Sequence, residues 1–587
     1  MTDRAGSVPT RALLSLAALA VAFAAADTYV VVLALPEMMS SVGVPIDQLQ
    51  RAAPIISGFL LGYVAMLPLI GRIADLRGRV PVLVFSLLLF AVGSLVTALS
   101  YDMSSMVAGR FLQGVGGGGL VPATLALVAD LYPKERRGVP LGIVSAVQEI
   151  GAVLGPLFGA VVVAFADWRA IFLINLAVGL VLAAALRSLA GVDAHPGPIP
   201  GGRFDLLGAL LLLVALVAGV LVFVRPAALL RDLTWGQLFI PYTESGRWLA
   251  PMGLIAMGAA ALLVVRCLLA ARPLLDLRGW GAHLAEADLV GALLLAAALA
   301  GVILAFATAD PKIQVFSDQG WWFLLGSAIA AVLFAVHMRR SSAPLVPRGA
   351  LRRTPAWGAL VVSFFIGAAL IAALIDIPLF ARTTVYPDSQ LLAALVLVRF
   401  LLALPVGAVV GGYLIRRFSP GVVTAVGMLL AAAGFVLMAQ WGLTTVQEPI
   451  ANLGLITGGF GFGLALAPVN AALLDFTDDD VHGVASAFVV VARMVGMLVG
   501  ISALTTIGLR RYYAEQGDIP PVREVCDGKS RCDAFSDLLR VAGIAQEQTV
   551  FYGAAGCAVV AAVLALVLFR AAKATPLSTR DLLTAHG

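Results

Sequence analysis

Charged residues are scarce in this 587-residue chain, where they make up 12% of the sequence. Soluble globular domains have about 25% charged residues and about 45–50% apolar residues. Here 61% of the residues are hydrophobic, and there are four cysteines. These values exclude an ordinary soluble enzyme, a disordered protein and a small disulfide scaffold. The formal net charge of +5 is too small to indicate a nucleic-acid partner. The composition instead predicts an all-α protein that crosses a membrane many times.

Two further scarcities exclude metal-centre and nucleotide chemistry. The five histidines are scattered, so no metal centre is expected. No G-x-x-x-x-G-K-[ST] loop is present to hold nucleotide phosphates, so we expect neither an enzyme nor a nucleotide-driven pump, and no cofactor. Glycine runs at 116–119 and 458–463 lie inside apolar stretches, where close helix packing explains them better than phosphate binding.

Apolar runs long enough to span a membrane, about 20 residues each, recur along the chain. They predict sixteen transmembrane helices: 12–35, 53–71, 80–100, 105–130, 139–166, 170–190, 206–224, 249–271, 287–309, 321–338, 356–380, 391–416, 420–442, 450–475, 482–510 and 547–571. They fall into a six-helix unit (1–190), a four-helix linker (191–355) and a second six-helix unit (356–587). The first run is long and carries Asp27, so we expect a retained span rather than a cleaved signal peptide.

Lys and Arg concentrate in alternate loops, which predicts the orientation in the membrane. Placing both termini in the cytoplasm puts most basic residues inside. We therefore expect a multi-pass membrane protein with both termini in the cytoplasm.

The linker contains an internal repeat. Residues 204–223 and 287–306 share eleven of twenty positions, including an Asp-Leu-x-Gly-Ala start at Asp205 and Asp288. A second apolar run and then Pro-Leu follow each copy. We expect a duplicated helical hairpin, with all four helices in one peripheral group; convergent Leu/Ala composition is the alternative.

Four motifs stand in the first unit. They are a loop after the second span (Gly71, Arg72, Asp75, Arg77, Gly78, Arg79), an R-x-x-Q-G element (Arg110, Gln113, Gly114), a G-x-x-x-G-P-x-x-G element (Gly151, Gly155, Pro156, Gly159), and an Asp27-Thr-Tyr-Val-Val-Val stretch ending at Pro36. Two glycines in the loop allow a tight turn, and Asp75 with the arginines could form a charge relay at a cytoplasmic gate. A generic basic loop on the cytoplasmic side would need neither Asp75 nor both glycines.

Together these motifs resemble the major facilitator superfamily, in its drug:proton antiporter branch with extra central helices. The resemblance implies two six-helix bundles that alternate access to a midplane cavity. Val30 to Leu33 stand where that branch has polar residues, so we expect a mainly apolar cavity.

Charged residues inside spans indicate function by default. Asp27, Glu149 and Arg493 lie deep in three spans and could face one another near one level. Because arginine keeps its proton, a carboxylate would carry the coupling proton, with Arg493 as its partner. A fixed structural ion pair is the alternative. Arg110 and Arg399 fit a structural role better.

The last two helices are unusually long. Helix 482–510 continues plausibly to Gly517, and the returning segment begins near Asp533. We expect a helical hairpin, about 508–546, projecting into the periplasm, with a Cys526–Cys532 disulfide at its tip; a disordered loop and free thiols are the alternatives. Its candidate lipid-facing residues are apolar: Phe535, Leu538, Leu539, Val541 and Ile544.

The stretches around Asp27, Glu149, Pro405 and Arg493, and the long last outer loop, are most similar to the mycobacterial triacylglyceride exporters that work with a periplasmic lipoprotein. The four linker helices depart from that pattern, where two are usual. The resemblance implies a monomer in a bacterial inner membrane that exports lipids, driven by protons, with a periplasmic lipid-carrier lipoprotein as partner. A multidrug:proton antiporter of the same fold and a non-transporting membrane scaffold are the alternatives.

Overall fold

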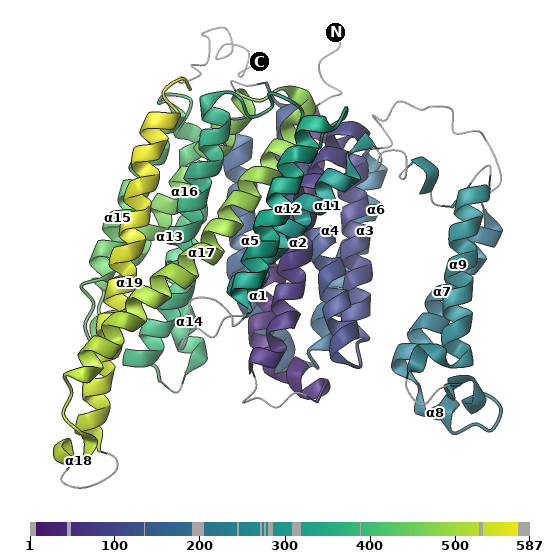
Figure 1. Cartoon of the computed structure of the whole chain (residues 1–587), viewed down its shortest axis with the longest axis horizontal. Helices are drawn as coiled ribbons and strands as arrows, with labels where there is room; N and C mark the ends of the chain where they lie inside the picture. The colour runs from purple at the N-terminus through teal and green to yellow at the C-terminus, as the bar shows by residue number, and fades with distance from the viewer. Residues whose placement is uncertain are drawn as a thin grey trace.

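Long helices make up nearly all of the structure. The computed structural model describes residues 7–43, 49–133, 136–190, 205–242, 246–270, 273–274, 277–279, 286–307, 319–387, 389–526 and 532–572. The long helices in these residues are α1 Ser7–Ser41, α2 Leu49–Arg77, α3 Arg79–Ala98, α4 Met103–Leu131, α5 Gly138–Phe165, α6 Arg169–Ala190, α7 Leu206–Val224, α9 Pro251–Leu269, α11 Leu289–Ala307, α12 Gly320–Arg340, α13 Thr354–Thr384, α14 Gln390–Leu414, α15 Pro420–Met438, α16 Ala451–Asp475, α17 His482–Gly517 and α19 Asp533–Leu568 (Figure 1). Short helical turns include α8 Ala227–Leu230 and α18 Val522–Val525.

Two six-helix bundles, α1–α6 and α13–α19, repeat the same packing plan. In the first, α4 packs between α2 and α3, α5 against α1, and α6 against α3. In the second, α16 packs between α14 and α15, α17 against α13, and α19 against α15. Glycines make both central helices fit: a Cβ at Gly114 would lie 2.1 Å from Phe59 O, and one at Gly459 2.0 Å from Phe400 O. The glycine runs therefore serve helix packing, as predicted.

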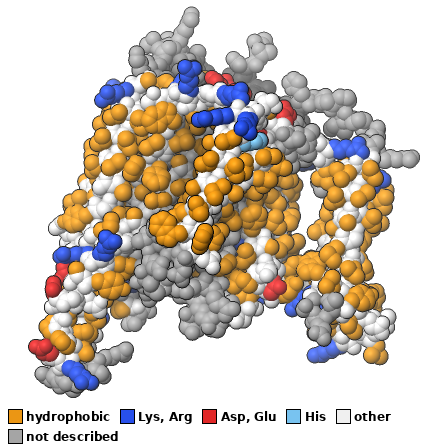
Figure 2. All heavy atoms as spheres, viewed as in Figure 1, with side chains coloured by type: hydrophobic (Ala, Val, Ile, Leu, Met, Phe, Trp, Pro, Cys, Tyr) orange, Lys and Arg blue, Asp and Glu red, His pale blue; other side chains and the backbone are white. Residues whose placement is uncertain are grey.

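The sides of the molecule are apolar. Fourteen of the helices are, in their described residues, long and apolar enough to cross a membrane, and α5 and α11 contribute shorter apolar stretches. Figure 2 shows hydrophobic side chains over the sides, with a group of Lys and Arg at the top and others near the lower ends on the left and right. We call that end, which carries residues 71–79, the motif end, and the opposite end, which carries α18, the hairpin end.

The four linker helices do not form one group. The α11/α12 hairpin packs on α2 and α17, across the seam between the two bundles, whereas α7 and α9 pack on each other and stand apart (Figure 1). The α7/α9 pair touches the first bundle at Tyr101, whose ring lies 5.7 Å from that of Phe223 and 3.9 Å from the Arg247 guanidinium carbon. The expectation of a single peripheral group was wrong, because the second hairpin has a packing site that the first does not use.

The linker repeat is visible in its hydrogen bonds. Asp205 accepts from the backbone N–H of Gly208 (3.0 Å) and of Leu274 (3.2 Å), and pairs with Arg266 at 3.1 Å. The second copy has the same cap on α11. There Asp288 accepts from Gly291 N–H (3.0 Å) and Leu345 N–H (2.9 Å), and His337 Nε2 lies 2.7 Å away.

Each aspartate therefore caps its helix and ties the end of the hairpin back to its start. In the first copy the Gly208 N–H, and then Arg266, hold the pKa of Asp205 below its usual value. The two copies differ in the basic residue, which is Arg in the first and His in the second.

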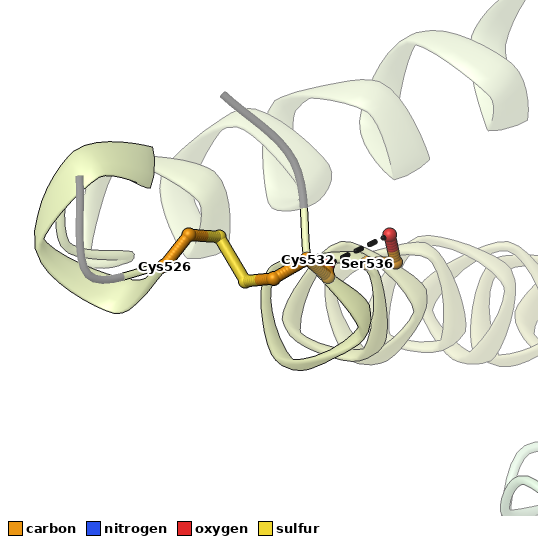
Figure 3. The surroundings of a disulfide bond; sticks show 3 residues. All are labelled: Cys526, Cys532 and Ser536. Carbon is orange, nitrogen blue, oxygen red and sulfur yellow. Dashed lines mark hydrogen bonds between the residues drawn. A yellow bond between two sulfur atoms is a disulfide. The ribbon is translucent and has the colours of Figure 1, made fainter. Parts of the chain in front are cut away.

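The last two long helices extend past the rest of the chain at the hairpin end (Figure 1). α17 ends at Gly517 and α19 begins at Asp533, close to the bounds predicted for the hairpin. Cys526 and Cys532 are joined by a disulfide, with Cα atoms 5.5 Å apart, and Ser536 Oγ donates to the Cys532 carbonyl (Figure 3). Residues 527–531, between the two cysteines, lie outside the described part of the chain.

Candidate transport site

The carboxylate of Asp27 lies inside the first bundle, 2% exposed. Its Oδ2 is 2.6 Å from Arg110 Nη1, and its Oδ1 accepts from Asn175 Nδ2 at 2.5 Å. Gln113 accepts from Arg110 at 2.9 Å and donates to Ser94 at 2.8 Å. Helices α1, α3, α4 and α6 thus supply one hydrogen-bonded network. Such a buried pair holds its charge only because partners replace water.

Aromatic rings enclose the charge of Arg110. The Phe59 ring centre lies 4.4 Å and the Phe172 ring centre 5.8 Å from its guanidinium carbon. Arg110 is 1% exposed. The R-x-x-Q-G element therefore builds the immediate surroundings of Asp27, a role that the sequence pattern alone did not reveal.

Of the two carboxylates predicted to face Arg493, Asp27 does not, because it faces Arg110 of α4 and Asn175 of α6 within its own bundle. Arg493 instead lies within electrostatic reach of Glu149, and Tyr63 on α2 faces both. Glu149 and Arg493 each stand eleven residues from the motif-end start of their helices, Gly138 and His482, which is about 16 Å at 1.5 Å per residue. These two opposite charges, one on each bundle, therefore stand at one level.

The helix-five motif positions α1 beside this network. A Cβ at Gly151 would lie 2.1 Å from Ala22 O, one at Gly155 2.3 Å from Ala26 O, and one at Gly159 2.9 Å from Val30. Because the obstacles at Gly151 and Gly155 are backbone atoms of α1, that helix cannot stay in place if either glycine gains a side chain. Pro156 lies in the same helix, but its side chain is outside the described set.

Gly155→Leu is expected to push α1 away from α5 and to disconnect Asp27 from Arg110. Overpacking of this kind costs about 1–3 kcal/mol or more, so thermal stability and transport should both fall. The matched control is Gly556→Leu on α19, where an added Cβ meets no atom within 4 Å. Scanning calorimetry of both variants in the same detergent checks the prediction; equal stability of the two would contradict it.

The motif loop joins the two bundles at the motif end. Asp75 Oδ1 accepts from Gly483 N–H at 2.7 Å and Oδ2 from Val484 N–H at 2.9 Å, so this carboxylate caps the first turn of α17. The positive end of the helix dipole favours a carboxylate there. Arg79 pairs with Asp75 at 2.5 Å and donates to the Asp479 carbonyl at 3.1 Å.

Further bonds across the same seam come from arginines of the first bundle. Arg72 donates to the Asp480 carbonyl at 3.3 Å, and Arg137 lies 4.0 Å from Asp479. The charged residues of the predicted relay therefore make contacts between the two bundles. Its second half, the acidic run 478–480 before α17, was missed; a run of acids at a helix start was the available signal.

The two glycines of the loop have different roles. Gly78 ends the turn with φ of 96°, a conformation that favours glycine. Gly71 lies within α2, where a Cβ would meet Gly483 O at 2.6 Å; a Cβ at Gly483 would meet Gly71 O at 2.4 Å. The expectation that both glycines form the turn was thus wrong for Gly71, which brings α2 and α17 into backbone contact. We call residues 71–79 with 479–484 the motif-end latch.

Two sets of predicted apolar lining residues are placed differently from expectation. Val30 and Val31 are buried among α2, α4 and α6 residues of the first bundle, so they do not line a central cavity; the side chains of Val32 and Leu33 lie outside the described set.

On the hairpin, the five residues do not share one face. Leu538 and Val541 are exposed, Ile544 is buried in the second bundle, and Leu539 lines a pocket; Phe535 is half-buried.

Known proteins resemble this chain in sequence. Residues 17–339 and 321–501 match the profile of the Major Facilitator Superfamily. A triacylglyceride transporter of Mycolicibacterium hassiacum is 35% identical over 573 residues, covering 94% of this chain and 91% of that protein. Triacylglyceride transporters of Mycobacteroides abscessus and Mycobacterium tuberculosis are 34% and 35% identical, covering 84% and 86% of this chain and 82% and 83% of theirs.

Solved structures share the fold. The human organic anion transporter MFSD10 aligns with a TM-score of 0.53 at 15% identity, over 95% of this chain and 100% of its own. The proton:xylose symporter XylE aligns with a TM-score of 0.52 at 13% identity, over 95% of each chain. These relatives are transporters, not enzymes. The chain is therefore a multi-pass membrane transport protein, and it belongs to the major facilitator superfamily.

Proposed function

We propose that this protein is a proton-coupled exporter of lipids, with triacylglycerides as its substrate class. The observation that carries the substrate assignment is the 35% identity, over nearly the whole chain, to a protein named a triacylglyceride transporter. A multidrug:proton antiporter would share the fold, but relatives with this coverage and identity favour the lipid.

Proton coupling is supported by the two intramembrane carboxylates. Asp27 is buried with Arg110, and Glu149 is buried within reach of Arg493 on the other bundle. A nearby cation stabilises the ionised form of a buried carboxylate, and this stabilisation is lost when the cation moves away. Because Glu149 and Arg493 sit on different bundles, rocking of the bundles would separate them and so favour protonation of Glu149.

We place the motif end in the cytoplasm and the hairpin end in the periplasm of a bacterial inner membrane. The Lys and Arg residues of the loops are more numerous at the motif end, as the positive-inside rule requires. With that orientation the structure is closed on the cytoplasmic side, where the motif-end latch joins the bundles.

The periplasmic hairpin is proposed to pass lipid to a soluble carrier lipoprotein. A triacylglyceride cannot cross an aqueous gap alone, because each exposed CH₂ costs roughly 0.8 kcal/mol. Leu538 and Val541 stay exposed on the outer part of α19 and could shield acyl chains. The disulfide fixes the tip of the two arms.

Transfer assays in proteoliposomes test the substrate class. Triacylglyceride and a cationic drug, each fluorescently labelled, would be followed from donor vesicles that contain the protein to an acceptor. We expect transfer of the lipid and not of the drug. Transfer of the drug alone would refute the lipid assignment, and transfer of neither under a gradient would favour the scaffold alternative.

Shortening both arms of the hairpin is expected to slow hand-off to the carrier. Removing about seven residues from each arm, roughly two turns, withdraws the tip by about 10 Å. If the wider gap between hairpin and carrier exposes only two more CH₂ groups of the lipid to water, transfer would slow roughly tenfold. The control is Cys526→Ser with Cys532→Ser, which leaves both arms at full length. Unchanged carrier loading by the shortened, folded protein would rule out the hand-off.

A further inference from the structure

Two carboxyl groups meet between α13 and α19, away from the sites described above. Asp376 is 6% exposed and Glu547 is 2% exposed, and their carboxyl groups lie within hydrogen-bonding reach of each other. Asp376 stands 22 residues from Thr354, and Glu547 stands 21 residues from Leu568, so both lie about 32 Å from the motif end. A bilayer core is about 30 Å thick, so the pair sits at its hairpin-end boundary.

The donors around the pair do not balance two negative charges. Glu547 Oε1 accepts from Gln546 Nε2 at 3.2 Å, while its Oε2 is buried and has no donor among the described groups. Ionised carboxylates only accept hydrogen bonds, so two of them can share one only if a proton lies between them. Two carboxylates in one buried place cannot both stay ionised. The burial of both groups and the shortage of donors therefore favour at least one bound proton.

A pocket connects this pair to the hairpin end. It has a volume of about 330 Å³, and Glu547 forms part of its wall. The other lining residues come from α13, α17 and the outer part of α19: Leu379, Thr383, Tyr512, Ser536, Leu539, Arg540, Gly543 and Gln546. Because the pocket is open and its wall includes Thr383, Ser536 and Gln546, water can reach Glu547 from that side.

We propose that Asp376 and Glu547 form a second proton-binding site, loaded from the hairpin end through this pocket. The proton is held between the two carboxyl groups and fastens the outer arm of α19 to α13. When it leaves to water in the pocket, two negative charges face each other at that contact and the arm loosens. The site is separate from Asp27 and Glu149, and its proton binding does not depend on the proposed function.

Other titratable groups nearby do not replace this proton. Tyr512 on α17 and Arg540 on α19 line the same pocket, and Arg540 is paired with Asp537 at 3.2 Å. Arg511 and Glu515 on α17 are paired with each other. On the side of α15, Tyr552 faces the amide of Gln440. Gln546 donates to Glu547 from the pocket wall.

Infrared titration of the full-length protein in lipid nanodiscs tests the site, since only a protonated carboxyl gives the carboxylic C=O band. We expect the wild type to lose such a band as pH rises between about 5 and about 9. Asp376→Asn and Glu547→Gln should each remove it, and the difference spectra exclude bands from other carboxyls. Glu524→Gln, an exposed carboxylate on α18, is the matched control and should keep the band.

Two more measurements test the proposal if Asp376→Asn or Glu547→Gln fails to fold. Gly543→Trp narrows the pocket and keeps both carboxyl groups, and the Cβ that it adds meets only Thr383 Cγ2 at 3.5 Å; the band should persist but exchange with D₂O several-fold more slowly. Amide exchange in residues 534–546 should accelerate above the transition pH, beyond its intrinsic pH dependence. The proposal is overturned if the titrating band is absent from the wild type or survives in both carboxyl variants. Because no reading needs lipid transfer, the result is independent of whether triacylglycerides are exported.

Discussion

Replacing Asp27 with Asn is expected to abolish proton-driven lipid transfer. The variant removes the charge that holds Arg110, whose Nη1 lies 2.6 Å from the carboxylate in a fully buried place. Breaking a buried ion pair by removing one partner costs about 3–5 kcal/mol. Both stability and transfer should therefore fall in this single variant.

A double variant separates the two effects. Asp27→Asn with Arg110→Met removes both charges and leaves no unpaired cation, so much of the lost stability should return. Transfer should not return, because no carboxyl remains at this position to exchange a proton. Calorimetry and lipid transfer measured on the same preparations check this. Recovery of both would mean that Asp27 and Arg110 form only a structural pair.

Gly71→Leu is expected to hold the motif end open and to stop the transport cycle. A side chain there would occupy the space of the Gly483 carbonyl, 2.6 Å from the position of Cβ, and would break the two bonds from Asp75 to the start of α17. Since the obstacle is backbone, α2 and α17 must move apart. Spin labels on the two bundles at the motif end would report a longer distance than in the wild type.

The matched control for the latch is Gly326→Leu on α12, where an added Cβ meets nothing within 4 Å. It should keep the wild-type distance and transport rate. A second comparison is Asp75→Asn, which keeps the close approach but weakens the cap and the pair with Arg79; its effect should be intermediate. If Gly71→Leu showed the wild-type distance distribution, the latch would not control closure.

The order of the long helices could be predicted from hydropathy, since each apolar run is bounded by turn residues or charges; of the sixteen predicted spans, fourteen are long and apolar enough in the described residues to cross a membrane. The bounds of α17 and of the start of α19 followed from apolar spacing beyond the length that a bilayer needs. The linker repeat was also visible, and the structure gives its reason: Asp205 and Asp288 make the same helix cap.

Partners of buried charges could not be predicted, because the sequence does not give the rotation of each helix about its axis. Asp27 faces α4 rather than the second bundle, and Glu149 rather than Asp27 faces Arg493. Asp27 and Glu149 do not lie at one level, because Gly155 packs on Ala26, next to Asp27, and stands six residues, about 9 Å, along α5 from Glu149.

The pair of Asp376 and Glu547 was missed altogether. Each is a single acid at the end of an apolar run, which also suits a residue at the membrane surface. Only the packing of α13 on α19 brings the two together. Likewise, the different positions of the two linker hairpins depend on a site between α2 and α17 that no pattern within the hairpins encodes.

Coupled proton flux is the most direct test of the account. Proteoliposomes that hold the protein, a pH-sensitive dye and triacylglyceride in the membrane would be given a lipid acceptor outside, with and without an imposed proton gradient. The account predicts that lipid leaves faster with the gradient, and that adding the acceptor changes the lumenal pH in the wild type but not in Asp27→Asn with Arg110→Met. Lipid transfer at the same rate without a gradient, with no change of lumenal pH, would contradict it.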